Sequence, residues 1–264
     1  MTVIALGSVS GAPGVSRLAI GLAAAWPEDR RRVLVEADPD GGRLGAELGV
    51  GVEPGLMALA LAARTARMSA DDLLVTGAAA AGSWFLVPAP PSSEQASSAL
   101  AHAATTLADV MVGADDDVWI VDTGRLSTRS AALPFALVAD ETVLVTAGHF
   151  PALQLVPHRV AALQRAGCRV SVVIVEPTSW APAEMAAFTG ADVLVVMPRV
   201  RAADRPVRAM RGANWRPWWR SVDALAAQFL ARRSPPAALD STHPPRPGDV
   251  EPAGDGAPVW GRYP

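Results

Sequence analysis

The sequence contains no lysine, because every one of its 23 basic residues is an arginine. No lysine from elsewhere in the chain can therefore enter a functional site, and only arginine is left to replace one. The single cysteine, Cys168, excludes an internal disulfide framework and a metal site built from clustered cysteines.

Long apolar runs are also missing. No run reaches the roughly 18 residues that a membrane-spanning helix needs. The chain starts with a strand-like run, without a basic segment or a cleavage site, so no secretory signal is predicted and a cytoplasmic protein is expected. The net charge of -3 lacks the basic excess that broad nucleic-acid affinity requires, so nucleic acid is not an expected partner.

Half of the 264 residues are apolar, which predicts a packed globular protein. Short valine-rich runs alternate with helical patterns, and the runs are continuous, as in strands that are buried on both faces of a parallel sheet. Strands are predicted near residues 3–8, 33–37, 84–88, 117–122, 142–146, 169–175 and 192–197. Helices are predicted near residues 15–26, 55–65, 92–113, 130–138, 151–166, 181–188 and 217–233. The predicted fold class is α/β, with a mostly parallel central sheet and helices on both faces.

The composition changes after Arg233. Eight of the last 31 residues are proline, and such a segment cannot bury enough apolar surface to offset the entropy lost on ordering. We therefore expect one α/β domain at residues 1–233 and a proline-rich, disordered tail at residues 234–264.

Polar residues follow three of the predicted strands, at the edge where open parallel sheets bind ligands. The stretch SGAPGVS, residues 10–16, follows the first strand, and its glycines let backbone N–H groups approach an anion. Asp38 and Asp40 follow the second strand, and Asp122 is expected at the tip of the strand at 117–122. Carboxylates beside a phosphate-binding loop commonly hold Mg²⁺, directly or through water.

The ordered set of these segments resembles the ParA/MinD family of deviant P-loop ATPases, whose loop reads K-G-G-x-G-K-T/S. The matching residues here are Ser10, Gly11, Ala12, Pro13, Gly14, Val15 and Ser16. The resemblance continues through VLVEADPDGG, VWIVDTG, ADETVLVTAGHFPAL and GADVLVVMPRVRAA, and spans roughly residues 2–232. No single motif is specific by itself, because the loop lacks the two lysines of the family pattern. The order of the segments along the chain carries the resemblance.

The resemblance implies ATP or ADP with Mg²⁺ as the cofactor. Its binding residues would be Gly11, Ala12, Pro13, Gly14, Val15, Ser16 and Arg17. Mg²⁺ would lie near Ser16, Asp38 and Asp122, and Asp38 holds the position that orients the attacking water in the family. Relatives dimerise over the nucleotide, so a homodimer and further protein partners are implied.

Three departures from the family loop weaken the implied activity. Val15 stands where the family has the lysine that bridges the β- and γ-phosphates, Ser10 stands where it has the lysine that reaches across the dimer, and Pro13 removes a backbone donor. Losing one charged donor to the transition state typically costs about 3 kcal/mol, a factor of about 10² to 10³ in rate. We therefore expect a degenerate member, a pseudo-ATPase that binds nucleotide weakly and hydrolyses it very slowly or not at all.

Two further features bear on ligand and role. Glu176 and Pro177 stand where the family often has Asn-Arg, whose asparagine helps to read adenine, so recognition of the base is weakened. The degenerate loop is similar to that of the family branch that accompanies tight-adherence pilus systems. This similarity implies a role in protein localisation or pilus assembly through protein contacts.

Three other interpretations are open. In the first, Arg17, Arg43 or Arg125 rebuilds the site by binding phosphate, and the chain is an active ATPase switch. In the second, the fold is a scaffold for protein contact without a nucleotide. In the third and least favoured, Glu36 binds a ribose as in a Rossmann oxidoreductase, although the glycine spacing matches neither that fingerprint nor its short-chain variant.

The predicted helix at 217–233 carries Trp218, Trp219 and other apolar residues on one side and arginines elsewhere. The favoured interpretation is a final helix packed on the sheet, with its tryptophans in the core. A helix on a membrane surface and a nucleic-acid contact are the alternatives.

Overall fold

The computed structural model describes residues 2–10, 14–27, 29–64, 68–114, 116–199 and 213–232. These residues belong to one compact unit, Met1–Arg233. The predicted loop residues Gly11, Ala12 and Pro13 lie outside the described residues, and so does the predicted tail at 234–264. The curvature of the loop and the disorder of the tail therefore stay predictions.

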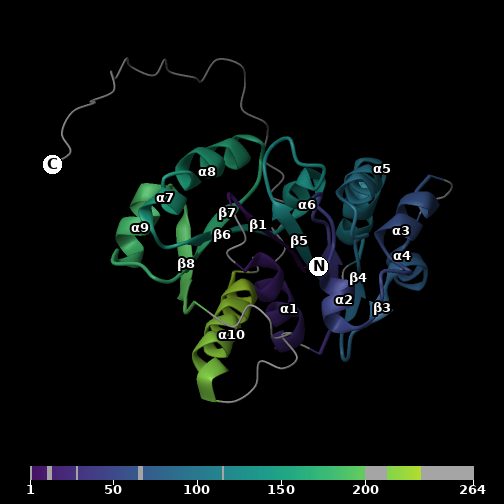
Figure 1. The fold of residues 1–264 in the computed structure, drawn as a ribbon, viewed down its shortest axis with the longest axis horizontal. Coiled ribbons are helices and arrows are strands. Elements are labelled where there is room, and N and C mark those ends of the chain that lie inside the picture. The colour runs from purple at the N-terminus through teal and green to yellow at the C-terminus, as the bar shows by residue number, and fades with distance from the viewer. Residues whose placement is uncertain are drawn as a thin grey trace, which may run out of the picture. The chain divides into compact units, whose positions relative to one another are not determined.

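Among the described residues, eight strands form one sheet, in the spatial order β3-β4-β2-β5-β1-β6-β7-β8 (Figure 1). They are β1 (Thr2–Ser8), β2 (Arg31–Glu36), β3 (Ala79–Ala80), β4 (Phe85–Val87), β5 (Asp117–Arg125), β6 (Glu141–Ala147), β7 (Val170–Val175) and β8 (Asp192–Met197). The short β3 pairs antiparallel with β4, and the other neighbouring strands pair in parallel. The predicted mostly parallel sheet is confirmed.

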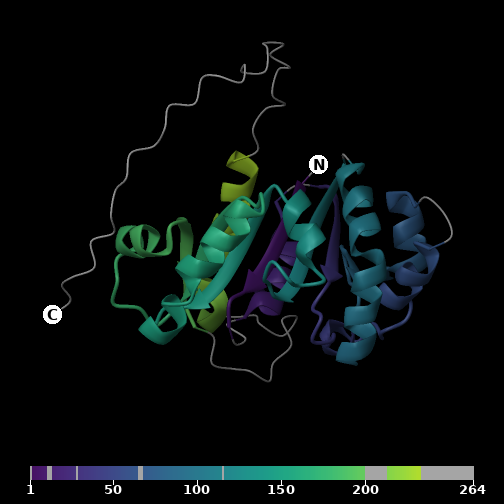
Figure 2. The ribbon, with the colours of Figure 1, turned by 90° about the horizontal axis from the view of Figure 1, so that it is seen from above.

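Side chains of the central strand β1 alternate between the two faces of the sheet. Ile4 and Leu6 join a buried cluster with α1 (Val15–Ala25) and α10 (Arg216–Ala231), whereas Val3 and Ala5 face the helices of the opposite layer. Figure 2 shows helices on both sides of the strands. The strands are thus buried on both faces, which is why they read as continuous apolar runs.

The other helices are α2 (Leu44–Leu48), α3 (Leu56–Ala62), α4 (Ala70–Gly77), α5 (Ser93–Val112), α6 (Leu133–Val138), α7 (Phe150–Leu153), α8 (Val156–Arg165) and α9 (Pro182–Thr189). A 3₁₀ turn, Ala213–Trp215, precedes α10. The alternation of strands and helices follows the predicted α/β order.

Several boundaries differ from the predicted ones. β5 runs to Arg125, beyond the predicted end at 122, because its pairing with β1 continues to Ser8. The helix predicted at 151–166 is two helices, α7 and α8, and Pro157 lies in the first turn of α8. Proline is favoured in a first turn because it has no N–H to donate there, so it marks a new start.

Three short elements were not predicted at all. α2 and β3 are too short to show the apolar periodicity by which longer elements are recognised. In α4 the large apolar residues, 73–75, are consecutive and lack the spacing of a helix face. The helix predicted at 55–65 ends at Ala62. α4 then begins with a capping box in which Ser69 and Asp72 bond each other's backbone N–H.

The last helix, α10, packs its apolar side against α1. Trp218 is 5% exposed, and its indole ring fills the space that a side chain at Gly21 would need. Trp219 is half-buried and lies edge-on to Trp218. The favoured interpretation, a packed final helix, is confirmed. Within the described ranges, we find no helix that combines the length and the apolar character required to cross a membrane.

Candidate functional site

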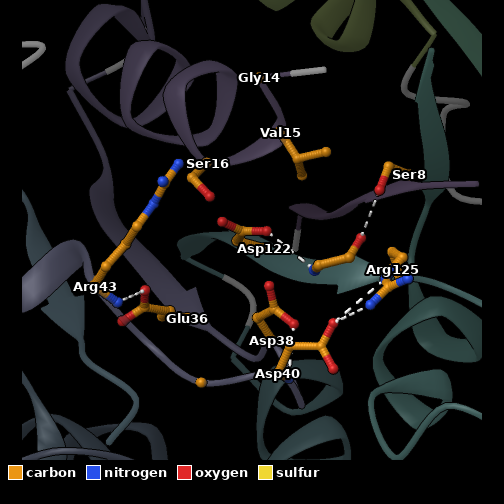
Figure 3. Close-up of a pocket in the computed structure, with 12 residues that line it drawn as sticks. Ser8, Gly14, Val15, Ser16, Glu36, Asp38, Asp40, Arg43, Asp122 and Arg125 are labelled. Atoms are coloured by element: carbon orange, nitrogen blue, oxygen red, sulfur yellow. Dashed lines mark hydrogen bonds and ion pairs between the residues drawn. The ribbon is translucent and has the colours of Figure 1, made fainter. Parts of the chain in front are cut away.

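A cavity of about 460 Å³ opens at the carboxyl ends of β1, β2 and β5, beside the first turn of α1 (Figure 3). It collects residues from all three polar segments that the sequence singles out. The predicted site residues that line it are Gly14, Val15, Ser16, Asp38 and Asp122. The predicted residues Gly11, Ala12 and Pro13 lie outside the described part of the chain.

The register of the sheet explains why these side chains meet. Asp122 on β5 lies opposite Leu6 of β1 on one side and opposite Glu36 of β2 on the other. Because parallel strands end at the same edge, the segments that leave β1 and β2 deliver Ser16 and Asp38 to the same place. The prediction that Asp122 lies at the tip of its strand is wrong, because β5 continues past it to Arg125 and Asp122 lies inside the strand.

Asp122 is 1% exposed. Its Oδ1 accepts a hydrogen bond of 3.1 Å from the N–H of Gly124. Its Oδ2 is buried and has no hydrogen-bond partner among the described residues, although the hydroxyl of Ser16 points toward the carboxylate (Figure 3). Burial raises the pKa of Asp122 to about 7, against the lowering effects of Ser16 and Gly124 and with a further rise from the charges of Glu36 and Asp38. A desolvated carboxylate oxygen in a cavity wall is suited to bind a cation.

Asp38 enters the cavity over Gly124 of β5. Gly124 has a φ of +58°, and a Cβ at this position would fall on the Asp38 carboxylate. A glycine is therefore needed here for Asp38 to take its place. Oδ1 of Asp38 accepts a hydrogen bond of 2.9 Å from the N–H of Asp40. Burial raises the pKa of Asp38, and this backbone hydrogen bond opposes the rise.

Ser16, Asp38 and Asp122 offer only oxygen atoms, which are the ligands that Mg²⁺ prefers. In the part of the chain that the structure describes, no group of three or more histidine, cysteine, aspartate or glutamate side chains is placed to hold a metal ion. Two carboxylates and one hydroxyl would therefore hold a Mg²⁺ only together with water and the phosphate oxygens of a ligand, and their oxygen atoms fit that role. When bound, such an ion would neutralise negative charge on the phosphate groups of the ligand.

Val15 lies in the first turn of α1, in the wall of the cavity, and is 5% exposed. Its side chain belongs to the buried cluster that contains Leu6 and Leu18. Gly14, just before the helix, has a φ of +107°, a left-handed conformation that favours glycine. The position where the resemblance places a lysine is therefore apolar and partly packed into the core, and it offers no charge to an anion.

Glu36 is the residue that would bind a ribose in the Rossmann interpretation. In the structure its carboxylate instead accepts hydrogen bonds from three backbone N–H groups. It is 2% exposed. Its Oε1 accepts hydrogen bonds from the N–H groups of Arg43 and Leu44, at 2.7 and 2.9 Å, and its Oε2 accepts one from Ala89 at 3.0 Å. Burial raises the pKa of Glu36, and the three backbone hydrogen bonds oppose the rise. Because both oxygens are committed to backbone groups, the structure gives the ribose interpretation no support.

The three arginines that the sequence singles out lie in different environments. Arg17 is not among the residues that line the cavity. Arg125 lies at its rim, where Nη2 is 2.8 Å from Oδ2 of Asp40, with exposed fractions of 63% and 62% for the two side chains. Arg43 lines the cavity, and its side chain points toward Ser16 in the close-up (Figure 3).

The architecture has counterparts among solved structures, although no family model and no curated protein matches the sequence. A ParA family ATPase from Chlorobium tepidum aligns over 86% of this chain and 98% of its own, with a TM-score of 0.69 and 16% identity. The chain has the ParA/MinD fold. The cell division ATPase MinD of Pyrococcus furiosus aligns over 86% of this chain and 100% of its own, with a TM-score of 0.68 and 16% identity. The septum site-determining protein MinD of Pyrococcus horikoshii, solved in complex with Mg-ADP, aligns over 88% and 98%, with a TM-score of 0.63 and 17% identity.

The ParA/MinD fold confirms the predicted structural resemblance over most of the chain. Two features of the cavity were missed by sequence reasoning. The first is the requirement for a glycine at position 124, where a Cβ would collide with the Asp38 carboxylate. In the sequence, Gly124 is only a glycine two residues after Asp122. The ion pair between Asp40 and Arg125 joins residues 85 positions apart, and neither residue carries a local signal for it.

Proposed function

We propose that this chain is a degenerate ParA/MinD-like P-loop protein, a pseudo-ATPase that binds Mg²⁺ with ATP or ADP weakly and acts through protein contacts. One observation carries the proposal. Ser16, Asp38 and Asp122 converge on one cavity at the start of α1, while the adjacent Val15 is apolar and buried. The convergence supports binding, and the apolar neighbour supports weak affinity and slow chemistry.

Support for nucleotide binding comes from the donor set. Asp122 presents an oxygen without a partner among the described residues, and a buried polar atom of this kind is stabilised when a cation or water reaches it. The Pyrococcus horikoshii MinD of the same fold holds Mg-ADP. We infer that the cavity accepts the same class of ligand, through Ser16 with Asp38 and Asp122 toward Mg²⁺ and through backbone groups of residues 11–16 toward phosphate.

Support for slow hydrolysis comes from the missing charge. Val15 cannot donate to the phosphate oxygens on which negative charge develops, and the loss of one such donor costs a factor of about 10² to 10³ in rate. Asp38 stays in the position that orients water in the family. The water-orienting group is therefore kept while the charge that stabilises the transition state is lost.

The role that we propose is in protein localisation or assembly, including the assembly of pili. It follows from the loop, whose degenerate form is similar to that of the pilus-associated branch. A homodimer over the nucleotide would lack one contact of the family, because Ser10 replaces the lysine that reaches across to the partner. We therefore propose a weak nucleotide site in a chain that acts through contacts with protein partners.

A scaffold without nucleotide is the second candidate, and the charges in the cavity favour it. Four carboxylates line the cavity, against the two guanidinium groups of Arg43 and Arg125. The carboxylates are those of Glu36, Asp38, Asp40 and Asp122. This balance repels phosphate unless Mg²⁺ binds with it, so the two candidates differ in whether Mg²⁺ makes a nucleotide bind.

Turnover of ATP tests the absence of catalysis. Phosphate release by the unmodified chain in saturating Mg-ATP should be no faster than by an Asp38→Ala variant, because the cavity lacks the charge that stabilises the transition state. A continuous phosphate-release assay measures both proteins in parallel. Release that is tenfold or more faster than in the Asp38→Ala variant would show an active ATPase and contradict the pseudo-ATPase assignment.

A further inference from the structure

The cavity needs a cation if it is to hold phosphate. The sequence offers three arginines for this role, and the structure places them in different environments. Arg17 does not line the cavity, and Arg125 is paired with Asp40 at its rim. Arg43 lines the cavity, and no hydrogen bond or ion pair of its guanidinium is found among the described residues. In the close-up this side chain leaves the segment after β2 and points toward the first turn of α1, where Ser16 lies (Figure 3).

The base of the Arg43 side chain is held firmly. Its backbone N–H donates to Oε1 of the buried Glu36 at 2.7 Å, and Glu36 also accepts from the N–H of Ala89, two residues after β4. The preceding residue, Gly42, lies so close to the carbonyl of Ala89 that a Cβ would collide with it. The segment is therefore fixed to two strands of the sheet, and the guanidinium starts from a defined position beside the cavity.

The electrostatic surroundings leave Arg43 available to an anion. Burial raises the pKa of Asp38, and the charges of Arg125 and Arg43 oppose that rise, so both arginines act on the cavity from nearby. Arg125 would have to break its hydrogen bonds to Asp40 before it could bind a ligand. Arg43 has no such contact to give up, and its planar group can bind two phosphate oxygens at once.

We propose that Arg43 is the phosphate-binding cation of this cavity and makes, from the segment after β2, the contact with a nucleotide's phosphate groups that Val15 cannot make. The inference rests on the proposed nucleotide binding and adds the residue that carries it. It also explains how a chain without lysine keeps a cation in this cavity.

Binding measurements on Arg43→Ala test the proposal, with Arg129→Ala as the matched control. Arg129 is exposed and does not line the cavity, and its removal changes the net charge equally. The probes are ADP, inorganic pyrophosphate and adenosine, each titrated calorimetrically in Mg²⁺ into the full chain. Arg43→Ala should weaken ADP and pyrophosphate by about tenfold or more and leave adenosine unchanged, because one bidentate charged contact is lost. Arg43→Lys should recover part of the affinity, since it keeps the charge without the fork.

The titrations distinguish a failure of the proposed role of Arg43 from a failure of the proposed nucleotide binding. If the unmodified chain binds neither ADP nor pyrophosphate, the proposed nucleotide binding fails, and the role of Arg43 fails with it. If the unmodified chain binds them and Arg43→Ala loses no more affinity than Arg129→Ala, only the role of Arg43 is overturned. A larger loss in Arg125→Ala than in Arg43→Ala would likewise overturn it and assign the contact to Arg125.

Discussion

Replacing Val15 by lysine should tighten the binding of ATP by about ten- to a hundredfold, the effect of one charged hydrogen bond to phosphate. Val15 lies in the first turn of α1 with its side chain at the boundary between the core and the cavity. A lysine stem can follow the same apolar path and place its ammonium among the ligand's phosphates. Binding calorimetry in Mg²⁺ measures the change.

The control is Val15→Met, which extends the side chain without adding charge. Methionine should leave the affinity for ATP unchanged within about twofold, because its thioether is at most a weak acceptor. Adenosine should bind equally to all three proteins, since it has no phosphate. If Val15→Lys folds and binds ATP no better than Val15→Met does, the rest of the pocket has lost its fit for phosphate.

Asp122→Asn should stabilise the ligand-free protein, and the gain should be clearly larger at pH 8 than at pH 5. Burial raises the pKa of Asp122 from 3.8 in the unfolded reference to about 7 in the folded chain, so the folded state binds the proton more tightly. Stability from this group is present at low pH and is lost as the pH rises from about 4 to about 7. Asparagine removes that loss, which is on the order of 2–4 kcal/mol above pH 7.

Chemical denaturation of both proteins at the two pH values measures this difference. Asp109→Asn, on the exposed side of α5, is the control for removing a carboxylate without removing a buried one. The control variant should show the same pH dependence as the unmodified chain. A stability gain in Asp122→Asn that is equal at pH 5 and pH 8 would contradict a buried carboxylate that titrates near neutrality.

Much of the fold could be predicted because the strands have a strong local signal. The runs that became β6 and β7 are rich in valine and continuous, which is what burial under two helix layers requires. The positions of Asp38 and Asp122 followed from one rule, that parallel strands bring their carboxyl ends to the same edge. The lining of the cavity was therefore predictable in outline before its geometry was known.

The rest could not be predicted because it depends on contacts between distant segments. In the sequence Glu36 is a polar residue at the end of a predicted strand, and only the fold brings the N–H of Ala89, 53 residues away, to its carboxylate. The pairing of Arg125 with Asp40 is equally non-local, and it decides which arginine is left for a ligand. Sequence alone counted three candidate arginines and had no means of choosing among them.

The most direct test is a calorimetric titration of ADP into the full chain with and without Mg²⁺, repeated with Ser16→Ala. The account predicts weak one-to-one binding that requires Mg²⁺ and is reduced about tenfold or more by Ser16→Ala, because Ser16 lies with Asp38 and Asp122 where the ion is expected. Absence of binding at millimolar ADP in Mg²⁺, or binding that neither Mg²⁺ nor Ser16→Ala alters, would contradict the claim that this cavity has kept a nucleotide site.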